Sequence, residues 1–295
     1  MNHPAVSVIV PSYNAARTIS GCLESLQRQS SPEPFEIIVV DSSSDGTAQL
    51  VARRFPDVRL YAFADRKFPG DARNLAVTQA RGEILAFIDA DCVADPDLVA
   101  QIVRAHRAPR PAIGGVVDNA NPRSYVGWAS YFCEFSQWIP RSAPRRMTEI
   151  PTCCLSLKRW AFDTYGPFRE GTYCSDTAFQ WKLGRAGYPP LLIPSIKVSH
   201  VNQNRLGSFL SHEPYHGRAF AVVRTSERRL TRRCRLSLVA LSPLLPLLLY
   251  FRMARGILEN RRYVKEFLVT SPLVLLGLVG WSLGEVLGYL STSGE

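Results

Sequence analysis

Short apolar runs alternate with helix-like segments along the first half of the chain. The apolar runs predict buried strands at 6–10, 36–40, 58–62 and 84–88. Between them, apolar residues recur at helical spacing, as Ile19, Leu23 and Leu26 do. Repeated strand–helix units of this length predict an α/β fold with a mostly parallel sheet and helices on both of its faces.

The pattern is less regular in the second half of the chain. Strands are predicted at 112–117 and 153–157 and in the region 191–200, and Ser175 is the expected N-cap of a helix through Gly187. Residues 118–150 combine many aromatic residues with several arginines. This composition indicates either a flexible or membrane-near insertion, or an ordinary helix with an aromatic core face.

The C-terminal part has a different composition. Two apolar segments, 236–251 and 267–290, alternate with stretches rich in arginine. The second segment is long enough to cross a bilayer, which takes about 20 residues. The first contains two prolines and has basic residues on both sides, which favours a re-entrant or interfacial element. A buried helical hairpin in a soluble domain is the alternative. We therefore divide the chain into a catalytic domain, 1–217, and a membrane-associated helical region, 218–295.

Composition and charge narrow the class of partner. The chain has 295 residues, a formal net charge of +10 and 46% hydrophobic residues. Such a charge favours an anionic partner: nucleic acid, a membrane surface or a phosphorylated substrate. No nucleic acid is expected, because the arginines cluster beside apolar segments. The seven cysteines lack metal-ligand spacing and the N-terminus lacks a signal-peptide pattern, so we expect a reduced, cytoplasmic catalytic domain.

The strand at 84–88 is followed directly by Asp89, Ala90 and Asp91. The carboxyl end of a central strand is where open α/β sheets bind ligands. Residues i and i+2 of an extended segment share a face, so the two carboxylates can converge on one target. A divalent cation carrying a diphosphate suits this pair. A pair of ordinary loop aspartates is the alternative.

Four segments resemble glycosyltransferase family 2. They are VSVIVPSYN (6–14), VDSSSDGT (40–47), GDARNLAVTQARGEILAFIDADC (70–92) and GPFREGTYCSDTAFQWKLGRAGY (166–188), in the family's order and spacing. The resemblance covers about residues 5–200. It implies the Rossmann-like GT-A fold. It also implies transfer of a sugar from a nucleotide diphosphate sugar with inversion at the anomeric carbon, with Mg²⁺ or Mn²⁺ as cofactor.

The resemblance assigns roles residue by residue. It implies nucleotide-binding positions at Pro11, Ser12, Tyr13, Asp41, Arg73, Asp89, Ala90 and Asp91. Asp91 matches the principal metal ligand, and His200 matches a residue that often completes the metal shell. An ordinary surface or core histidine is the alternative for His200. Asp41 matches the residue that reads the base, and its carboxylate can accept from a uracil N–H.

Asp176 is the candidate general base. A base must take the proton of the acceptor hydroxyl, and the first turn of a helix keeps a carboxylate ionised. Complementing the helix dipole is the alternative role. The family usually has Glu-Asp where this chain has Ser175-Asp176. Thr152-Cys153-Cys154 replaces a segment that in the family is often Gly- and Asn-containing and lines the acceptor pocket. We place Cys153, Cys154, Ser175, His216 and Arg218 on the acceptor side.

The function predicted from the sequence is an inverting glycosyltransferase. Its expected donor is a nucleotide sugar, with a UDP-sugar favoured. Its expected acceptor is a lipid-linked or membrane-delivered saccharide in polysaccharide or glycolipid synthesis. The expected location is the cytoplasmic face of the inner membrane. A sugar nucleotidyltransferase would need a Gly-rich basic loop after the first strand, where this chain has PSYNAAR. A non-catalytic membrane-associated nucleotide-sugar-binding protein is the remaining alternative.

Overall fold

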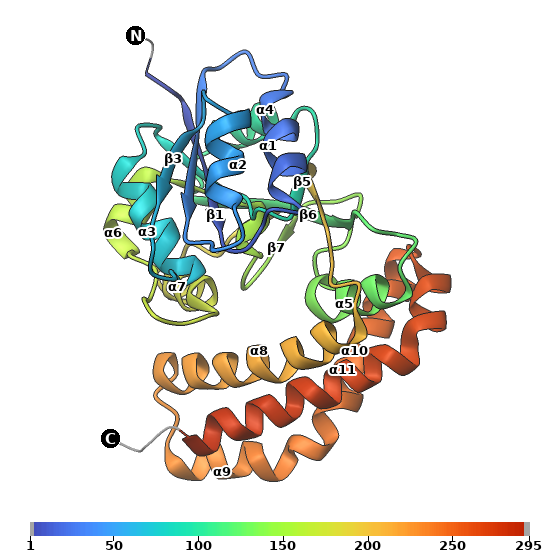
Figure 1. Cartoon of the computed structure of the whole chain (residues 1–295). Helices are drawn as coiled ribbons and strands as arrows, with labels where there is room; N and C mark the ends of the chain where they lie inside the picture. The colour runs from blue at the N-terminus through green and yellow to red at the C-terminus, as the bar shows by residue number, and fades with distance from the viewer. Residues whose placement is uncertain (1–2, 292–295) are drawn as a thin grey trace. The chain divides into compact units, whose positions relative to one another are not determined.

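The computed structural model describes residues 3–291, which form two compact units (Figure 1). The first unit contains the chain up to Ala120 together with Pro140–Val201. The second contains Asn121–Ile139 together with the chain from Asn202 onward. The second unit therefore takes its first helix from the middle of the sequence. The division of the catalytic and membrane-associated regions after residue 217 stays a prediction.

The first unit is built on one mixed sheet in the strand order β3-β2-β1-β4-β8-β6-β9-β5, with β7 beside β9. Neighbours among β3, β2, β1 and β4 run parallel, whereas β8 runs antiparallel to both β4 and β6. The strands are β1 (Val6–Ser12), β2 (Phe35–Asp41), β3 (Arg59–Ala62), β4 (Ile84–Phe87), β5 (Cys92–Ala94), β6 (Ala112–Asn119), β7 (Arg145–Arg146), β8 (Leu155–Lys158) and β9 (Leu191–His200).

This strand order brings many chain segments to one edge of the sheet. Because β6 and β4 are both antiparallel to β8, they point the same way, and β9 is parallel to β6. The carboxyl ends of β1, β2, β4, β6 and β9 therefore lie at the same edge. The antiparallel strands β8 and β5 begin at that edge, as the pairs Phe87–Leu155 and Cys92–His200 confirm. Open α/β sheets bind ligands at this edge.

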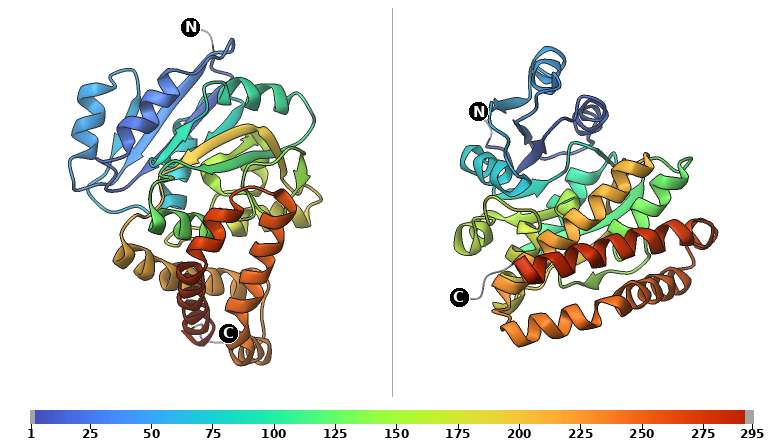
Figure 2. Two further views of the ribbon diagram at one scale, coloured as in Figure 1. Left: turned by 90° about the vertical axis from the view of Figure 1, so that its right-hand side faces the viewer. Right: turned by 60° about the horizontal axis from the view of Figure 1, so that its bottom comes forward.

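Helices lie on both sides of this sheet (Figure 2). They are α1 (Ile19–Gln27), α2 (Thr47–Arg54), α3 (Pro69–Gln79), α4 (Leu98–His106), α6 (Arg159–Tyr165) and α7 (Ser175–Arg185). The apolar strand residues between them form the core: Val8, Ile9, Ile38 and Leu85 are fully buried. The predicted α/β fold is confirmed, and β4 is buried as its uncharged sequence indicated.

Two local expectations are corrected by the structure. Residues 153–157 are not a continuous strand, because the 3₁₀ turn η1 (Thr152–Cys154) precedes β8. Ser175 is the first residue of α7, and the N-cap is Cys174 with a left-handed backbone at φ 58°.

Residues 118–150 contain an ordinary helix, as the alternative interpretation of this segment proposed. Helix α5 (Tyr125–Phe135) is capped by the Ser124 hydroxyl, which accepts from the Gly127 N–H. Four of its aromatic side chains, Trp128, Tyr131, Phe132 and Phe135, are buried in the second unit, whereas Tyr125 at its start is exposed. Phe132 packs edge-on against Phe267 with ring centroids 5.2 Å apart. The aromatic residues therefore form a core face, as the helix interpretation proposed, and this helix is not a flexible segment. Its nearness to a membrane stays a prediction.

The rest of the second unit is helical. Its elements are α8 (Leu206–Glu227), α9 (Arg232–Leu241), the 3₁₀ turn η2 (Ser242–Leu244), α10 (Leu245–Asn260) and α11 (Val264–Ser291). Helices α8 and α11 pack closely (Figure 2). A Cβ at Gly284 would lie 2.1 Å from the Pro214 carbonyl oxygen, and a Cβ at Gly217 would lie 2.1 Å from that of Trp281. Glycines that let backbones approach in this way are typical of helix packing in membranes.

The glutamate inside the last apolar segment has polar partners. The Glu285 carboxylate accepts from the Trp281 indole N–H at 2.7 Å and from the Tyr289 hydroxyl at 2.9 Å. Paired in this way, the buried carboxylate does not prevent α11 from lying in an apolar environment.

Two segments of the described chain are long and apolar enough to cross a membrane, Arg232–Asn260 and Val264–Ser291. Large apolar side chains on them are exposed, among them Leu248 at 67% and Phe251 at 66%. A soluble protein rarely exposes so large an apolar surface. This exposure weakens the interpretation of the two segments as a buried hairpin.

Candidate active site

Arg73 and Asp89 form an ion pair at the carboxyl end of β4. The Ile88 N–H still donates to Ile9 at 3.0 Å, so the chain leaves the sheet only at Asp89. Arg73, on α3, is 4% exposed, and its guanidinium lies 2.5 Å from an Asp89 oxygen. Burial raises the pKa of Asp89, the Arg73 charge opposes this rise, and Asp91 adds to it. Arg73 therefore holds Asp89 in place and compensates its charge, while its expected contact with a nucleotide stays a prediction.

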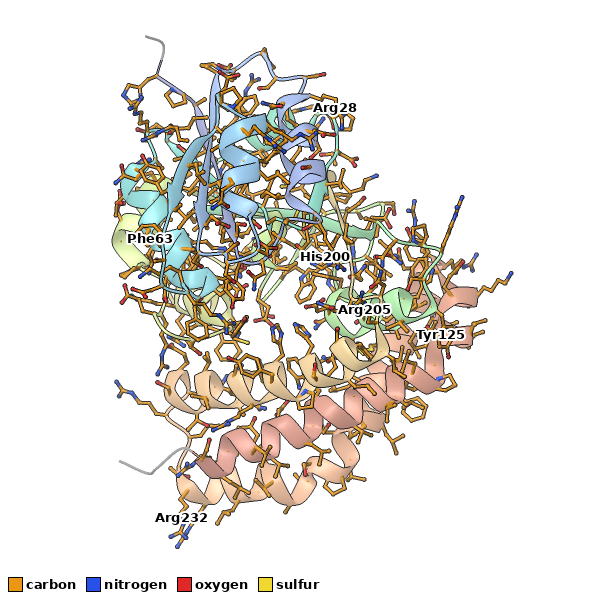
Figure 3. All side chains as sticks on the ribbon, in the orientation of Figure 1. Arg28, Phe63, Tyr125, His200, Arg205 and Arg232 are labelled. Atoms are coloured by element: carbon orange, nitrogen blue, oxygen red, sulfur yellow. The ribbon has the colours of Figure 1, made fainter. Side chains whose placement is uncertain are left out.

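Asp91 and His200 come together from distant parts of the sequence. The Asp91 carbonyl accepts from the Val201 N–H at 2.8 Å, immediately after β9 ends at His200. The His200 Nε2 lies 3.3 Å from an Asp91 carboxylate oxygen. His200 is labelled in Figure 3. The two side chains matched to a metal shell are thus neighbours, as the shared sheet edge requires.

This pair fits a divalent cation. Ligand atoms of Asp91, Cys92 and His200 all lie within 4.8 Å of one another. Burial, a hydrogen bond with Cys153 and nearby carboxylates raise the pKa of the Cys92 thiol, so it stays protonated. The available donors are therefore one carboxylate and one imidazole. Imidazole suits transition metals, whereas Mg²⁺ prefers oxygen alone. A carboxylate and an imidazole together can hold a divalent metal ion.

Asp41 lies beside Ser12 where β1 and β2 end together. It is 1% exposed, and its two carboxylate oxygens accept from the Ser43 hydroxyl at 2.6 Å and the Ser43 N–H at 3.2 Å. Pro11 and Ser12 belong to β1. The end of the strand thus presents a carboxylate that the following loop fixes. Recognition of the nucleotide base by the Asp41 carboxylate stays a prediction.

Tyr13 is exposed and stacks with an arginine that sequence reasoning did not select. The Arg66 guanidinium lies 4.5 Å from the centre of the Tyr13 ring and donates to the Tyr173 hydroxyl at 3.0 Å. Arg66 therefore links the loop after β1 to the loop before α7. The sequence offered no signal for it beyond the positive charge.

Asp176 lies in the first turn of α7 and accepts a short hydrogen bond from the Thr152 hydroxyl. Gln180 fixes the same turn: its side-chain amide donates to Ile150 and accepts from it, at 2.8 Å each. Thr152 precedes β8, so it stands at the same sheet edge as Asp89. The sequence contains no signal for Gln180, and it marks Thr152 only as the first residue of the segment that departs from the family pattern.

The expected acceptor-side residues are spread over both units. Cys153 and Cys154 are 2% and 4% exposed and pack in the core beneath the sheet edge. The Ser175 side chain lies against Gly70, where an added Cβ would be 2.5 Å from its hydroxyl oxygen. His216 and Arg218 lie on α8 in the second unit. Contact of these residues with an acceptor stays a prediction.

Residues 7–163, more than half of the chain, match the family described as Glycosyl transferase family 2. The chain belongs to glycosyltransferase family 2. The resemblance seen in the sequence is therefore confirmed.

Curated relatives are similar over part of their length. Validoxylamine A glucosyltransferase of Streptomyces hygroscopicus subsp. limoneus is 31% identical over 155 residues, which are 50% of this chain and 34% of the relative. Succinoglycan biosynthesis protein ExoO of Rhizobium meliloti is 36% identical over 126 residues, which are 42% of this chain and 35% of the relative. The chain thus matches about a third of the length of these relatives.

Solved structures share the fold. The mannosyltransferase PcManGT from Pyrobaculum calidifontis, in complex with GDP-Man and Mn²⁺, has a TM-score of 0.64 at 20% identity and covers 97% of this chain and 88% of its own. Residues 1–349 of TarS from S. aureus, in complex with UDP-GlcNAc, have a TM-score of 0.52 at 17% identity. The match covers 95% of this chain and 90% of the TarS chain. The GT-A fold implied by the sequence is thereby confirmed.

Proposed function

We propose that this protein is an inverting, metal-dependent glycosyltransferase that moves a sugar from a nucleotide diphosphate sugar to an acceptor hydroxyl. The pairing of Asp91 with His200 at 3.3 Å carries the proposal. It places a carboxylate and an imidazole at the ligand-binding edge of a family 2 sheet, next to the Arg73–Asp89 ion pair.

Asp91 and His200 would hold a divalent ion, preferentially Mn²⁺. When bound, such an ion stabilises the negative charge of the departing diphosphate. Asp89, ion-paired with Arg73, orients the donor from the neighbouring position. The Mn²⁺ in the similar mannosyltransferase structure supports this assignment.

The donor is a nucleotide sugar, with a UDP-sugar favoured. Asp41, fixed by Ser43, presents an acceptor for the N–H of a pyrimidine base. Tyr13, held by Arg66, would lie against the nucleotide. Pro11, Ser12 and Ala90 complete the nucleotide-binding edge. The neighbours contain UDP-GlcNAc and GDP-Man, which supports the class of donor.

Asp176 takes the proton of the attacking hydroxyl. The Thr152 hydroxyl occupies one oxygen of the Asp176 carboxylate and fixes its direction in the first turn of α7. The other oxygen is then the one that meets the acceptor. Ser175, whose side chain lies against Gly70, and the buried Cys153 and Cys154 are the proposed acceptor-side residues of the first unit. A general base held in this way contributes typically two to four orders of magnitude to the rate, about 10²–10⁴-fold.

The acceptor is lipid-linked or delivered at a membrane. The exposed apolar side chains of α9–α11 and the arginines near them suit an anionic bilayer surface. His216 and Arg218 on α8 are the proposed acceptor-side residues of the second unit. The positive charge of the arginine-rich stretches beside the apolar segments agrees with a location of the catalytic unit on the cytoplasmic side of the membrane.

The decisive experiment compares donor binding with transfer in Asp176→Asn. We expect nucleotide-sugar affinity close to that of the wild type and a kcat lower by about 10²–10⁴-fold, the range of a lost general base. Asp163→Asn, an exposed carboxylate on the neighbouring helix α6, is the matched control and should retain activity. Equal loss of binding and turnover would make Asp176 a donor-site residue. A wild-type protein that binds donors but transfers nothing would favour the non-catalytic alternative.

A further inference from the structure

The second unit contains a cluster of metal-ligating side chains apart from the Asp91–His200 pair. Glu134 comes from α5, and His212 and His216 come from α8. One ligand atom from each of the three lies within 4.8 Å of the other two. The two histidines are four residues apart and therefore share a helix face, with ring centroids 4.0 Å apart. The Glu134 carboxylate lies 3.9 Å from the His212 Nε2.

The helix that carries the histidines is fixed in place. Pro214 and Gly217, which lie between and beside them, contact the α11 backbone so closely that glycine is required at Gly217 and Gly284. Helix α5 is anchored to α11 through Phe132 and Phe267. The three ligating side chains thus project from two helices that pack on a common third helix. This prepositions them as a metal site requires.

We propose that Glu134, His212 and His216 bind a divalent transition-metal ion, with Zn²⁺ as the best match. Two imidazoles and one carboxylate form a ligand set typical of zinc and leave a fourth position open. Around a tetrahedral zinc, ligand atoms lie roughly 3.3 Å apart at bond lengths of about 2.0–2.2 Å. The observed 4.8 Å limit is compatible with that geometry after small side-chain rotations.

Glu213 supplies a further element of such a site. It is 3% exposed, and its carboxylate lies 3.9 Å from the His212 Nδ1, the nitrogen opposite the one that faces Glu134. A carboxylate that is hydrogen-bonded to the second nitrogen orients a metal-bound imidazole and raises its basicity, and Glu213 would take this role once the 3.9 Å separation shortens on metal binding. Residues 212–216 read His-Glu-Pro-Tyr-His, the His-Glu-x-x-His spacing that places two histidine ligands on one helix face. The ion would link α5 to α8 within the second unit.

The test measures metal binding and not transfer. Full-length protein in detergent carries Asp91→Asn throughout, which removes the carboxylate of the other candidate site. Zinc content is measured after gel filtration, and Co²⁺ is added to metal-free protein to record its visible absorption. We expect zinc to stay bound and Co²⁺ to give the intense bands of a tetrahedral site. Protein that retains no zinc and gives only the weak spectrum of hydrated Co²⁺ would overturn the proposal.

Variants identify the ligands. Glu134→Gln keeps the side-chain volume, and His216→Gln removes an imidazole; each should abolish the tetrahedral Co²⁺ spectrum. Glu213→Gln should weaken affinity by about 10–100-fold, the usual cost of losing an outer partner. Tyr215→Phe changes an exposed residue on the same helix turn and is the matched control. Helix content is checked by circular dichroism. If Glu134→Gln and His216→Gln both fold and still bind Zn²⁺ and Co²⁺ as the Asp91→Asn protein does, the ligand assignment is wrong. An acceptor contact for His216 is then favoured.

Discussion

Removing Arg73 should destabilise the first unit through the charge that it leaves behind. The guanidinium is 4% exposed and lies 2.5 Å from Asp89, whose side chain is 33% exposed. Breaking a fully buried pair by removing one partner costs about 3–5 kcal/mol. Because solvent reaches a third of Asp89, we reduce this to about 2–3 kcal/mol for Arg73→Met. In a unit of this size, that loss lowers the melting temperature by about 4–12 °C.

The pH dependence of this loss follows from Asp89. Its pKa in the folded protein is raised by burial and held back by Arg73, so it should rise further in Arg73→Met. An acid whose folded pKa is raised binds protons more tightly when folded. The charged form of Asp89 therefore lowers the free energy of unfolding at pH values above the pKa of the folded protein. This loss disappears as the pH falls toward the pKa that Asp89 has in the unfolded chain. The variant should be most destabilised at neutral pH and approach the wild type on acidification.

The assay is thermal unfolding of the full-length protein in detergent across this pH range. Arg73→Met with Asp89→Asn is the control, since it removes both charges and should recover part of the loss at neutral pH. A double-mutant cycle then gives the coupling of the pair. An unchanged melting temperature in Arg73→Met at neutral pH would refute the reasoning. A double variant that is as unstable as the sum of both singles would also refute it.

Three further predictions concern the metal, the base and the membrane. Asp91→Asn should abolish Mn²⁺-dependent nucleotide binding in calorimetry while the melting temperature stays close to that of the wild type; wild-type affinity for UDP with Mn²⁺ would contradict the assignment. Thr152→Val should lower kcat by about 10-fold or more at unchanged donor affinity, since a hydrogen bond to a charged group contributes about 1.5–3 kcal/mol. Thr152→Ser, which keeps the hydroxyl, should retain most of the activity; equal loss in both variants would count against positioning of Asp176 by the hydroxyl. Full-length protein should stay in the membrane fraction after alkaline carbonate washing, and its release into the supernatant would contradict insertion of α9–α11.

The structure also changes how membrane association is best tested. A chain ending after residue 217 would retain α5 but lose α11, against which Phe132 packs. Such a chain would expose aromatic residues that are buried in the whole protein, and its behaviour would report misfolding as well as membrane loss. The intact chain is therefore the appropriate material.

The sequence by itself determined the first unit's fold class and its first half in detail. Buried strands are recognisable because their apolar residues are consecutive, and helices because their apolar residues recur with the helical period. The carboxylates Asp89 and Asp91 were found because they directly follow such a strand. The ordered motifs identified the family, and the apolar composition of residues 236–290 identified the unusual C-terminal part.

Tertiary structure decided which distant residues meet. His200 reaches Asp91 because β8 runs antiparallel between β4 and β6 and so turns β9 toward the same edge. Thr152 meets Asp176 across 24 positions of the sequence, and nothing in the sequence marks the two residues as partners. Helix α5 joins the second unit although it lies in the middle of the chain. The periodicity of apolar residues depends on each segment alone, whereas strand order and helix partners depend on the whole chain. Both candidate sites consist of residues that only these long-range contacts bring together.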